Sequence, residues 1–194
     1  MVLKDTYNIV LYGDSISKGV VYDEQRKKYI VLDECFPALL QNKLKGAIYN
    51  VAKFGNTIIK AIGKFPNEVL KKNPDVVIIE FGGNDCDFDW EQIAENPLGT
   101  HNPKTDFNAF QKLLKNLIET LDKNGITPVL LTLPPIDADR YFKWISRNSA
   151  VMGEKILKWL GSVSKIYWWQ ERYNSAILSI ANETKTRLID IRST

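Results

Sequence analysis

Short apolar runs alternate with longer amphipathic segments along the chain. The apolar runs predict strands at residues 7–12, 47–51, 76–81, 127–133 and 186–191. Run 76–81 is apolar almost throughout, which is typical of a strand buried on both faces of a parallel sheet. Three segments, 35–44, 105–123 and 166–184, repeat their apolar residues every three or four positions, as helices do. The alternation predicts an α/β fold, a parallel sheet of about five strands with helices on both faces, in a single domain over 1–194.

The segment from about 135 to 165 fits neither pattern, and we expect an irregular insertion or lid there. It is rich in aromatic residues, namely Tyr141, Phe142, Trp144 and Trp159. Together with Trp168 and Trp169 these side chains form either a wall that binds an acyl group or sugar, or a small core within the lid. Trp169 falls on the apolar face of the predicted helix, which leaves Trp168 as the candidate for a contact over the substrate cleft.

Composition narrows the functional class. The 194 residues carry a net charge of +3, and their lysines are scattered, so we expect no nucleic-acid partner. No apolar run approaches the roughly 20 residues that span a bilayer, and no signal peptide is seen at the first residues, so we expect a cytoplasmic protein. One histidine and two cysteines, Cys35 and Cys86, cannot form a structural zinc site without carboxylates, so no metal is expected. A Cys35–Cys86 disulfide is an open alternative.

Three polar loops follow predicted strands, and the carboxyl ends of parallel strands meet at one edge of a sheet. The loops are Gly13-Asp14-Ser15-Ile16, residues 50–57 with Gly55, and Gly82-Gly83-Asn84-Asp85. Ser15 supplies a hydroxyl at the start of a helix, whose free N–H groups favour negative charge. Gly55 allows close approach of the backbone to a ligand, and Asn84 offers an amide donor. A hydroxyl nucleophile with such donors is what acyl transfer requires, although each loop alone is also common in turns.

In this order the three loops resemble the sequence blocks of the GDSL (SGNH) hydrolase family, over residues 7 to 85. The resemblance implies a flavodoxin-like three-layer fold and esterase, lipase or acylhydrolase activity on a small-molecule ester, with no cofactor. It implies that Ser15 is the nucleophile, and that the N–H groups of Ser15 and Gly55 and the side chain of Asn84 form the oxyanion hole. Asp14 then supports the turn that carries the nucleophile.

The fourth block of that family, Asp-x-x-His, supplies the catalytic base and is not found in this chain. Asp190 has no histidine three positions later, and His101 lies in the loop 97–103, where it is either a substitute base or simply solvated. We therefore expect a C-terminally incomplete domain that hydrolyses esters weakly or not at all. We also expect a sheet face left uncovered, which favours a homo-oligomer.

Two other functions stay open at this point. One is a non-catalytic module that binds a small molecule or a carbohydrate ester on the same fold. The other, a flavin or nucleotide binder, is disfavoured because the loop at Gly13 lacks both glycine-rich phosphate-binding spacings.

Glu80 either faces the site with a raised pKa or accepts hydrogen bonds from loop N–H groups. Nothing near Cys86 in the sequence indicates a reactive thiol.

Overall fold

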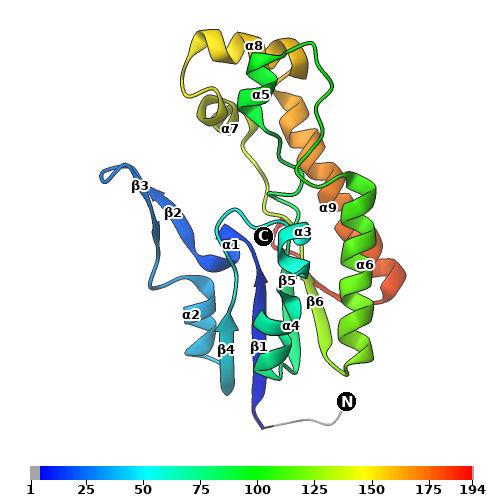
Figure 1. Ribbon diagram of the computed structural model, residues 1–194. Coiled ribbons are helices and arrows are strands. Elements are labelled where there is room, and N and C mark those ends of the chain that lie inside the picture. The colour runs from blue at the N-terminus through cyan, green and yellow to red at the C-terminus, as the bar shows by residue number, and fades with distance from the viewer. Residues whose placement is uncertain (1–4, 194) are drawn as a thin grey trace.

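The computed structural model describes residues 5–193 and contains a five-stranded parallel sheet (Figure 1). Its strands lie in the order β4-β1-β5-β6-β7, with bounds Gly46–Asn50, Tyr7–Gly13, Val76–Glu80, Thr127–Leu131 and Arg187–Ile189. Numbered along the chain, this is the order 2-1-3-4-5 of flavodoxin-like folds. The predicted fold class and all five predicted strands are confirmed.

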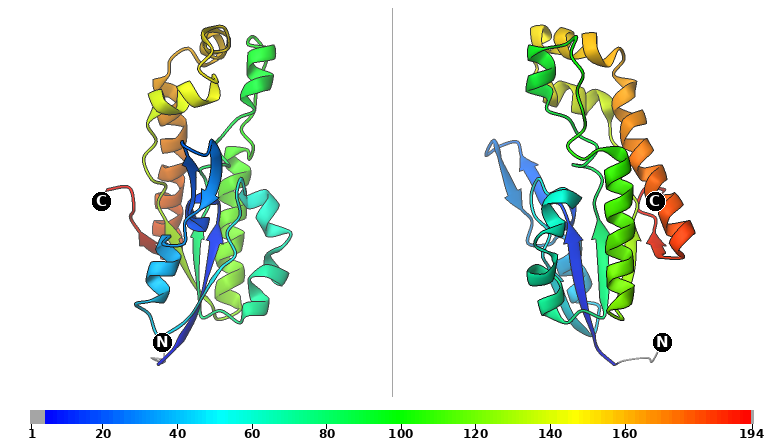
Figure 2. Two further views of the ribbon diagram at one scale, coloured as in Figure 1. Left: turned by 90° about the vertical axis from the view of Figure 1, so that its left-hand side faces the viewer. Right: turned by 45° about the vertical axis from the view of Figure 1, so that its right-hand side comes forward.

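Helices cover both sides of the sheet. They are α2 (Phe36–Gln41), α3 (Ile58–Ile62), α4 (Phe65–Glu68), the 3-10 helix η1 (Leu70–Lys72), α6 (Phe107–Lys123) and α9 (Ser164–Thr184). Figure 2 shows α2 on the opposite side of the sheet from α4 and α6. The main core joins one sheet face to α3, α4, α6 and α9 through Tyr12, Phe81, Leu114 and Ile177, all buried. The apolar stripe expected over 105–123 faces this core, and so does the stripe over 166–184 from Trp169 onward, whereas Ile166 packs in a second core.

The segment 135–165 is helical, so the expectation of an irregular segment was wrong. It forms α7 (Ala138–Ile145) and α8 (Ala150–Leu160), which are capped by the side chains of Asp137 and Ser149. With α5 (Trp90–Glu95) and the first turns of α9 they make a second, smaller core around Ile156, and we call this group the helical cap. The helical cap stands beyond the carboxyl ends of the strands (Figure 1). Both helices are too short to repeat an apolar period clearly in the sequence.

A β-hairpin of β2 (Val20–Asp23) and β3 (Lys28–Val31) was also not predicted. It follows the single-turn helix α1 (Ser15–Lys18) and projects from the sheet toward the helical cap (Figure 1). Tyr22 and Tyr29 contact the Trp144 ring of α7, with centroids 5.3 and 6.1 Å apart. The two strands of the hairpin have only four residues each, most of them exposed, so they leave almost no hydrophobic pattern in the sequence.

Among residues 5–193, no helix combines the length and apolarity needed to cross a bilayer.

The packing of α6 allows a direct test of the main core. Leu114 is 1% exposed, so Leu114→Ala removes its packing atoms and leaves a cavity. We expect the free energy of unfolding to fall by about 2–5 kcal/mol, measured by urea denaturation followed by circular dichroism. Lys112→Ala, on the exposed face of the same helix, is the control and should change it by less than about 0.5 kcal/mol. A similar loss in both variants would contradict the assigned core face.

Candidate active site

The site lies where the order of the sheet strands reverses, between β1 and β5. Gly13 and Glu80 pair at the carboxyl ends of these strands, so the loops that follow them start side by side. A Cβ on Gly13 would lie 2.6 Å from the Glu80 carbonyl oxygen, which only glycine avoids. The next residues place Ser15 as the first residue of α1, and the Asp14 carboxylate accepts a hydrogen bond from the Ile16 N–H at 2.9 Å. The close approach of two strands therefore fixes the backbone turn that carries Ser15.

Asn84 is held beside Ser15 through Asp14. The Asn84 Nδ2 donates to Asp14 Oδ2 at 2.9 Å, although the two residues are far apart in the sequence. An amide nitrogen carries two N–H donors, so this bond orients Asn84 and leaves one donor for a ligand. Ser15, Asn84 and Asp14 line the same cavity. The structure thus brings together these three predicted residues.

Gly55 belongs to the loop after β4, which hydrogen-bonds to the end of β1. Both the Lys53 N–H and the Asn56 Nδ2 donate to the Gly13 carbonyl, at 3.2 and 3.4 Å. Gly55 has a φ of +65°, a conformation that favours glycine. Within residues 5–193 no acceptor pairs with its N–H, but Gly55 is not among the residues that line the cavity. Its loop is therefore anchored next to Ser15, while its own role stays a prediction.

Glu80 lies directly behind the turn that carries Ser15 and is fully buried. Its Oε2 accepts hydrogen bonds from the Asp14 N–H at 3.3 Å and the Ser17 Oγ at 3.0 Å. The interpretation that Glu80 accepts bonds from the loop is confirmed. Burial raises the pKa of Glu80 well above the usual range, and the neighbouring Asp14 charge raises it further. Burial also raises the pKa of Asp14. The turn that carries Ser15 therefore rests on two neighbouring carboxyl groups. Ionisation of both at once is unfavourable because the two negative charges repel each other.

Asp85 ties three loops together. Its Oδ1 accepts from the Ile58 N–H at 2.9 Å and the Thr105 Oγ1 at 2.6 Å, and its Oδ2 accepts from the Gly82 N–H at 3.0 Å. Burial raises the pKa of Asp85 to about 6, against the opposing effect of these hydrogen bonds. Asp85 thus fixes the loop that presents Asn84 without itself lining the cavity that holds Ser15.

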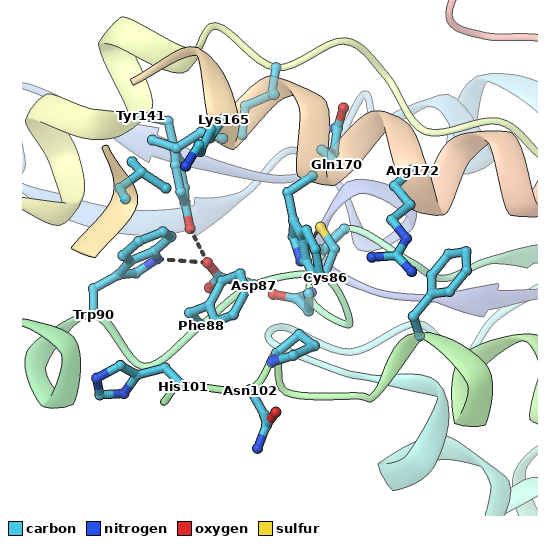
Figure 3. Close-up of a pocket in the computed structure, with 18 of the residues that line it drawn as sticks. Cys86, Asp87, Phe88, Trp90, His101, Asn102, Tyr141, Lys165, Gln170 and Arg172 are labelled. Atoms are coloured by element: carbon cyan, nitrogen blue, oxygen red, sulfur yellow. Dashed lines mark hydrogen bonds between the residues drawn. The ribbon is translucent and has the colours of Figure 1, made fainter. Parts of the chain in front are cut away.

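The cavity extends from Ser15 and Asn84 into the helical cap and has a volume of about 630 Å³. Its far wall is aromatic, formed by Phe88, Trp90, Tyr141, Trp159 and Trp169. Figure 3 shows the first three of these. Of the expected aromatic wall, Tyr141, Trp159 and Trp169 are therefore present. Trp168, the residue expected over the cleft, is 73% exposed and does not line the cavity. Adjacent residues of a helix point in different directions, and Trp169 is the one that faces the cavity.

Asp87 joins the helical cap to the sheet. It accepts hydrogen bonds from the Tyr141 hydroxyl at 2.6 Å and the Trp90 Nε1 at 2.8 Å (Figure 3). The Lys104 Nζ donates to its other oxygen at 2.6 Å. Sequence reasoning did not single out Asp87, since its partner Tyr141 is distant along the chain. It also passed over Lys165 and Arg172, whose spacing from Trp169 along one helix was the available signal.

His101 lines the cavity, but its ring is otherwise engaged. Its Nε2 donates to the Asn96 carbonyl at 2.8 Å, and its ring contacts Trp159 at 5.6 Å. Within residues 5–193, no side chain hydrogen-bonds the Ser15 hydroxyl. Asp190 follows β7 and accepts from the Thr132 Oγ1 at 3.0 Å, and turn hydrogen bonds hold the pKa of Asp190 down to about 2. The interpretation that Asp190 lies outside the catalytic set agrees with this local role.

The two cysteines are not joined to each other. Both are free thiols. Cys86 is buried, and its Sγ donates a hydrogen bond to the Gly83 carbonyl oxygen at 3.2 Å. Burial raises the pKa of Cys86, which favours the unreactive thiol. In the described part of the chain, no group of three or more His, Cys, Asp and Glu side chains is arranged to hold a metal ion.

Comparison with known proteins agrees with this geometry. The sequence profile of the GDSL-like lipase/acylhydrolase family matches residues 11–194. An uncharacterized lipoprotein, YqeF, from Bacillus subtilis strain 168 is 26% identical over 94% of this chain and 70% of its own length. A lipase/acylhydrolase structure from Enterococcus faecalis superposes with a TM-score of 0.64 at 18% identity, over 97% of this chain and 77% of that one. The acetyl xylan esterase AlAXEase superposes with a TM-score of 0.61 at 24% identity, over 96% and 78%.

The buried Glu80 allows a prediction about pH. A carboxyl whose pKa is raised on folding stabilises the fold fully below its unfolded pKa of about 4.3, and this contribution is lost as the pH rises through the raised value. Glu80→Gln keeps an oxygen acceptor for Asp14 and Ser17 but cannot ionise. We expect the free energy of unfolding of this variant, relative to wild type, to rise by up to about 1.4 kcal/mol per pH unit above about pH 4.

Urea denaturation from about pH 4 to about pH 8 measures this difference. Glu154→Gln, which changes an exposed carboxyl of α8, is the control and is expected to follow the wild type at each pH. A difference between Glu80→Gln and wild type that stays constant over this range would show that the pKa of Glu80 is not raised.

Proposed function

Because the chain belongs to the GDSL-like lipase/acylhydrolase family, we propose that it cleaves carboxylic esters with Ser15 as the nucleophile. One observation carries this proposal. Ser15 begins α1 at the reversal point of the sheet, beside an Asn84 amide that Asp14 holds in place, and both open on one cavity. A small-molecule ester in that cavity would meet a hydroxyl and hydrogen-bond donors together.

The proposed reaction proceeds through an acyl-enzyme. The Ser15 Oγ attacks the ester carbonyl, and the carbonyl oxygen becomes an oxyanion that accepts hydrogen bonds from Asn84 and the N–H groups of Ser15 and Gly55. The C–O bond to the alcohol then breaks, and the alcohol leaves with the proton that the Ser15 hydroxyl lost to a base. Water attacks the acyl-Ser15 ester, releases the acid and restores the hydroxyl. Support for the donor set comes from the free second N–H of Asn84 and the unpaired N–H of Gly55 within residues 5–193.

Acyl transfer also needs a base that accepts the proton of the Ser15 hydroxyl. Among residues 5–193, no such group is hydrogen-bonded to this hydroxyl. His101, the single histidine, donates a hydrogen bond from its Nε2 to the Asn96 carbonyl oxygen. In serine hydrolases, loss of the base costs about 10⁶ in kcat, while binding and the oxyanion hole retain roughly 10³–10⁴ over water. We therefore expect slow ester hydrolysis by this chain, accelerated by an external base such as imidazole.

The nucleophile can be identified by covalent labelling. Incubation with a fluorophosphonate probe in the presence of imidazole, followed by peptide mass spectrometry, is expected to give one adduct on Ser15. Ser15→Ala should abolish it, whereas Ser162→Ala, which changes an exposed serine after α8, should label like wild type. Labelling elsewhere, or none at all, would contradict Ser15 as the nucleophile.

Asn84 can be tested by rate. Asn84→Ala removes the amide donor, and we expect Ser15 labelling and hydrolysis of 4-nitrophenyl acetate to slow by about 10²–10³. Asn108→Ala is the matched control, since Asn108 lines the same cavity on α6 but has no part in the proposed oxyanion hole. Melting temperatures of both variants check the fold. Equal rates for Asn84→Ala and wild type would remove Asn84 from the mechanism.

A further inference from the structure

One face of α9 presents two cationic side chains to the cavity. Lys165, Trp169 and Arg172 are spaced by four and three residues, which places them on the same side of a helix. All three line the cavity that contains Ser15. Figure 3 shows Arg172 reaching from α9 toward this space, with Lys165 farther along the same helix.

The Arg172 guanidinium is held in place by aromatic rings. It lies 4.1 Å from the centroid of the Phe107 ring and 5.1 Å from that of Trp169. Stacking fixes the plane of the guanidinium while leaving its N–H groups, which point outward in that plane, free to donate. Within residues 5–193 neither Arg172 nor Lys165 forms an ion pair with a carboxylate. The adjacent Glu171 instead pairs with Arg192 at 2.7 Å.

The acidic side chains that line the cavity are already occupied. Asp87 accepts from Lys104, Tyr141 and Trp90, and Asp14 accepts from Asn84 and Ile16. Asp106 caps α6 by accepting from the N–H groups of Asn108 and Ala109. Each carboxylate therefore has donors of its own, and the two cations of α9 face the cavity without an internal partner.

We propose that Arg172 binds a carboxylate or phosphate group of the molecule that occupies this cavity, with Lys165 adding positive charge and the aromatic wall contacting its apolar part. A stacked guanidinium presents paired N–H donors whose spacing matches two oxygens of such an anion. Lysine, as a point charge, cannot reproduce this geometry. The inference deepens the proposed function, on which it rests, because it makes the preferred substrate an ester that also carries a negative charge.

Binding, measured without turnover, tests this proposal. We suggest calorimetric titration of Ser15→Ala with three probes of similar shape: 4-phenylbutyrate, 2-phenylethyl phosphate and the neutral 4-phenylbutanamide. We expect at least one anion to bind roughly tenfold more tightly than the amide, as a charge-assisted hydrogen bond provides. The preferred anion distinguishes a carboxylate ligand from a phosphate ligand. The preference should weaken as ionic strength rises.

Variants locate the effect. Adding Arg172→Gln should reduce the preference for the anion to less than about threefold, and Arg172→Lys should retain part of it because the charge remains without the paired donors. Arg140→Gln, which changes an exposed arginine of α7 outside the cavity, should leave the preference unchanged. Equal affinity for charged and neutral probes, no binding of any probe, or a preference that survives Arg172→Gln would overturn the proposal. Because Ser15 is absent from this assay, a failure of Ser15 labelling would reject the nucleophile without affecting this result.

Discussion

The buried Asp85 carboxylate is the interaction on which the site geometry depends. Its two oxygens accept from the start of α3, the turn after β5 and the segment before α6, so one side chain joins the connection that follows β4 to two parts of the connection that follows β5. Burying a charge is costly unless it is hydrogen-bonded, and these three donors offset that cost. The position of Asn84, and through Asp14 that of Ser15, follows from this one junction. The segments at the carboxyl edge of the sheet are therefore hydrogen-bonded to one another where the proposed chemistry takes place.

A second carboxyl, Glu80, supports the same edge from behind. It holds the backbone of Asp14 and the hydroxyl of Ser17, while the charge of Asp14 disfavours its ionisation. A protonated Glu80 would accept these bonds without repelling the Asp14 carboxylate. The turn that carries Ser15 thus rests against two carboxyl groups, and burial raises the pKa of each.

Local sequence was sufficient for the sheet and for most of the site's near wall. The apolar run of β5 and the periodicity of α6 specify their elements alone, and Ser15 and Asn84 are found because each directly follows a strand. Part of the aromatic far wall was also expected from the sequence, but the charged residues around it were not. Asp87 accepts a hydrogen bond from Tyr141, and Arg172 stacks on Phe107. Both contacts join residues that are far apart in the sequence and that only the fold brings together. The short helices α7 and α8 owe their stability to packing within the helical cap, which a one-dimensional pattern does not record.

The helix α9 is shared by two cores. Ile166 packs in the core of the helical cap, and Tyr173 packs in the main core, within 21 uninterrupted helical residues. Because one helix is packed in both cores, the helical cap cannot move relative to the sheet without bending or twisting the stretch between these two residues. Trp169 and Arg172 lie within that stretch. Any displacement of the helical cap relative to the sheet would therefore act on the two turns of helix that carry these cavity residues.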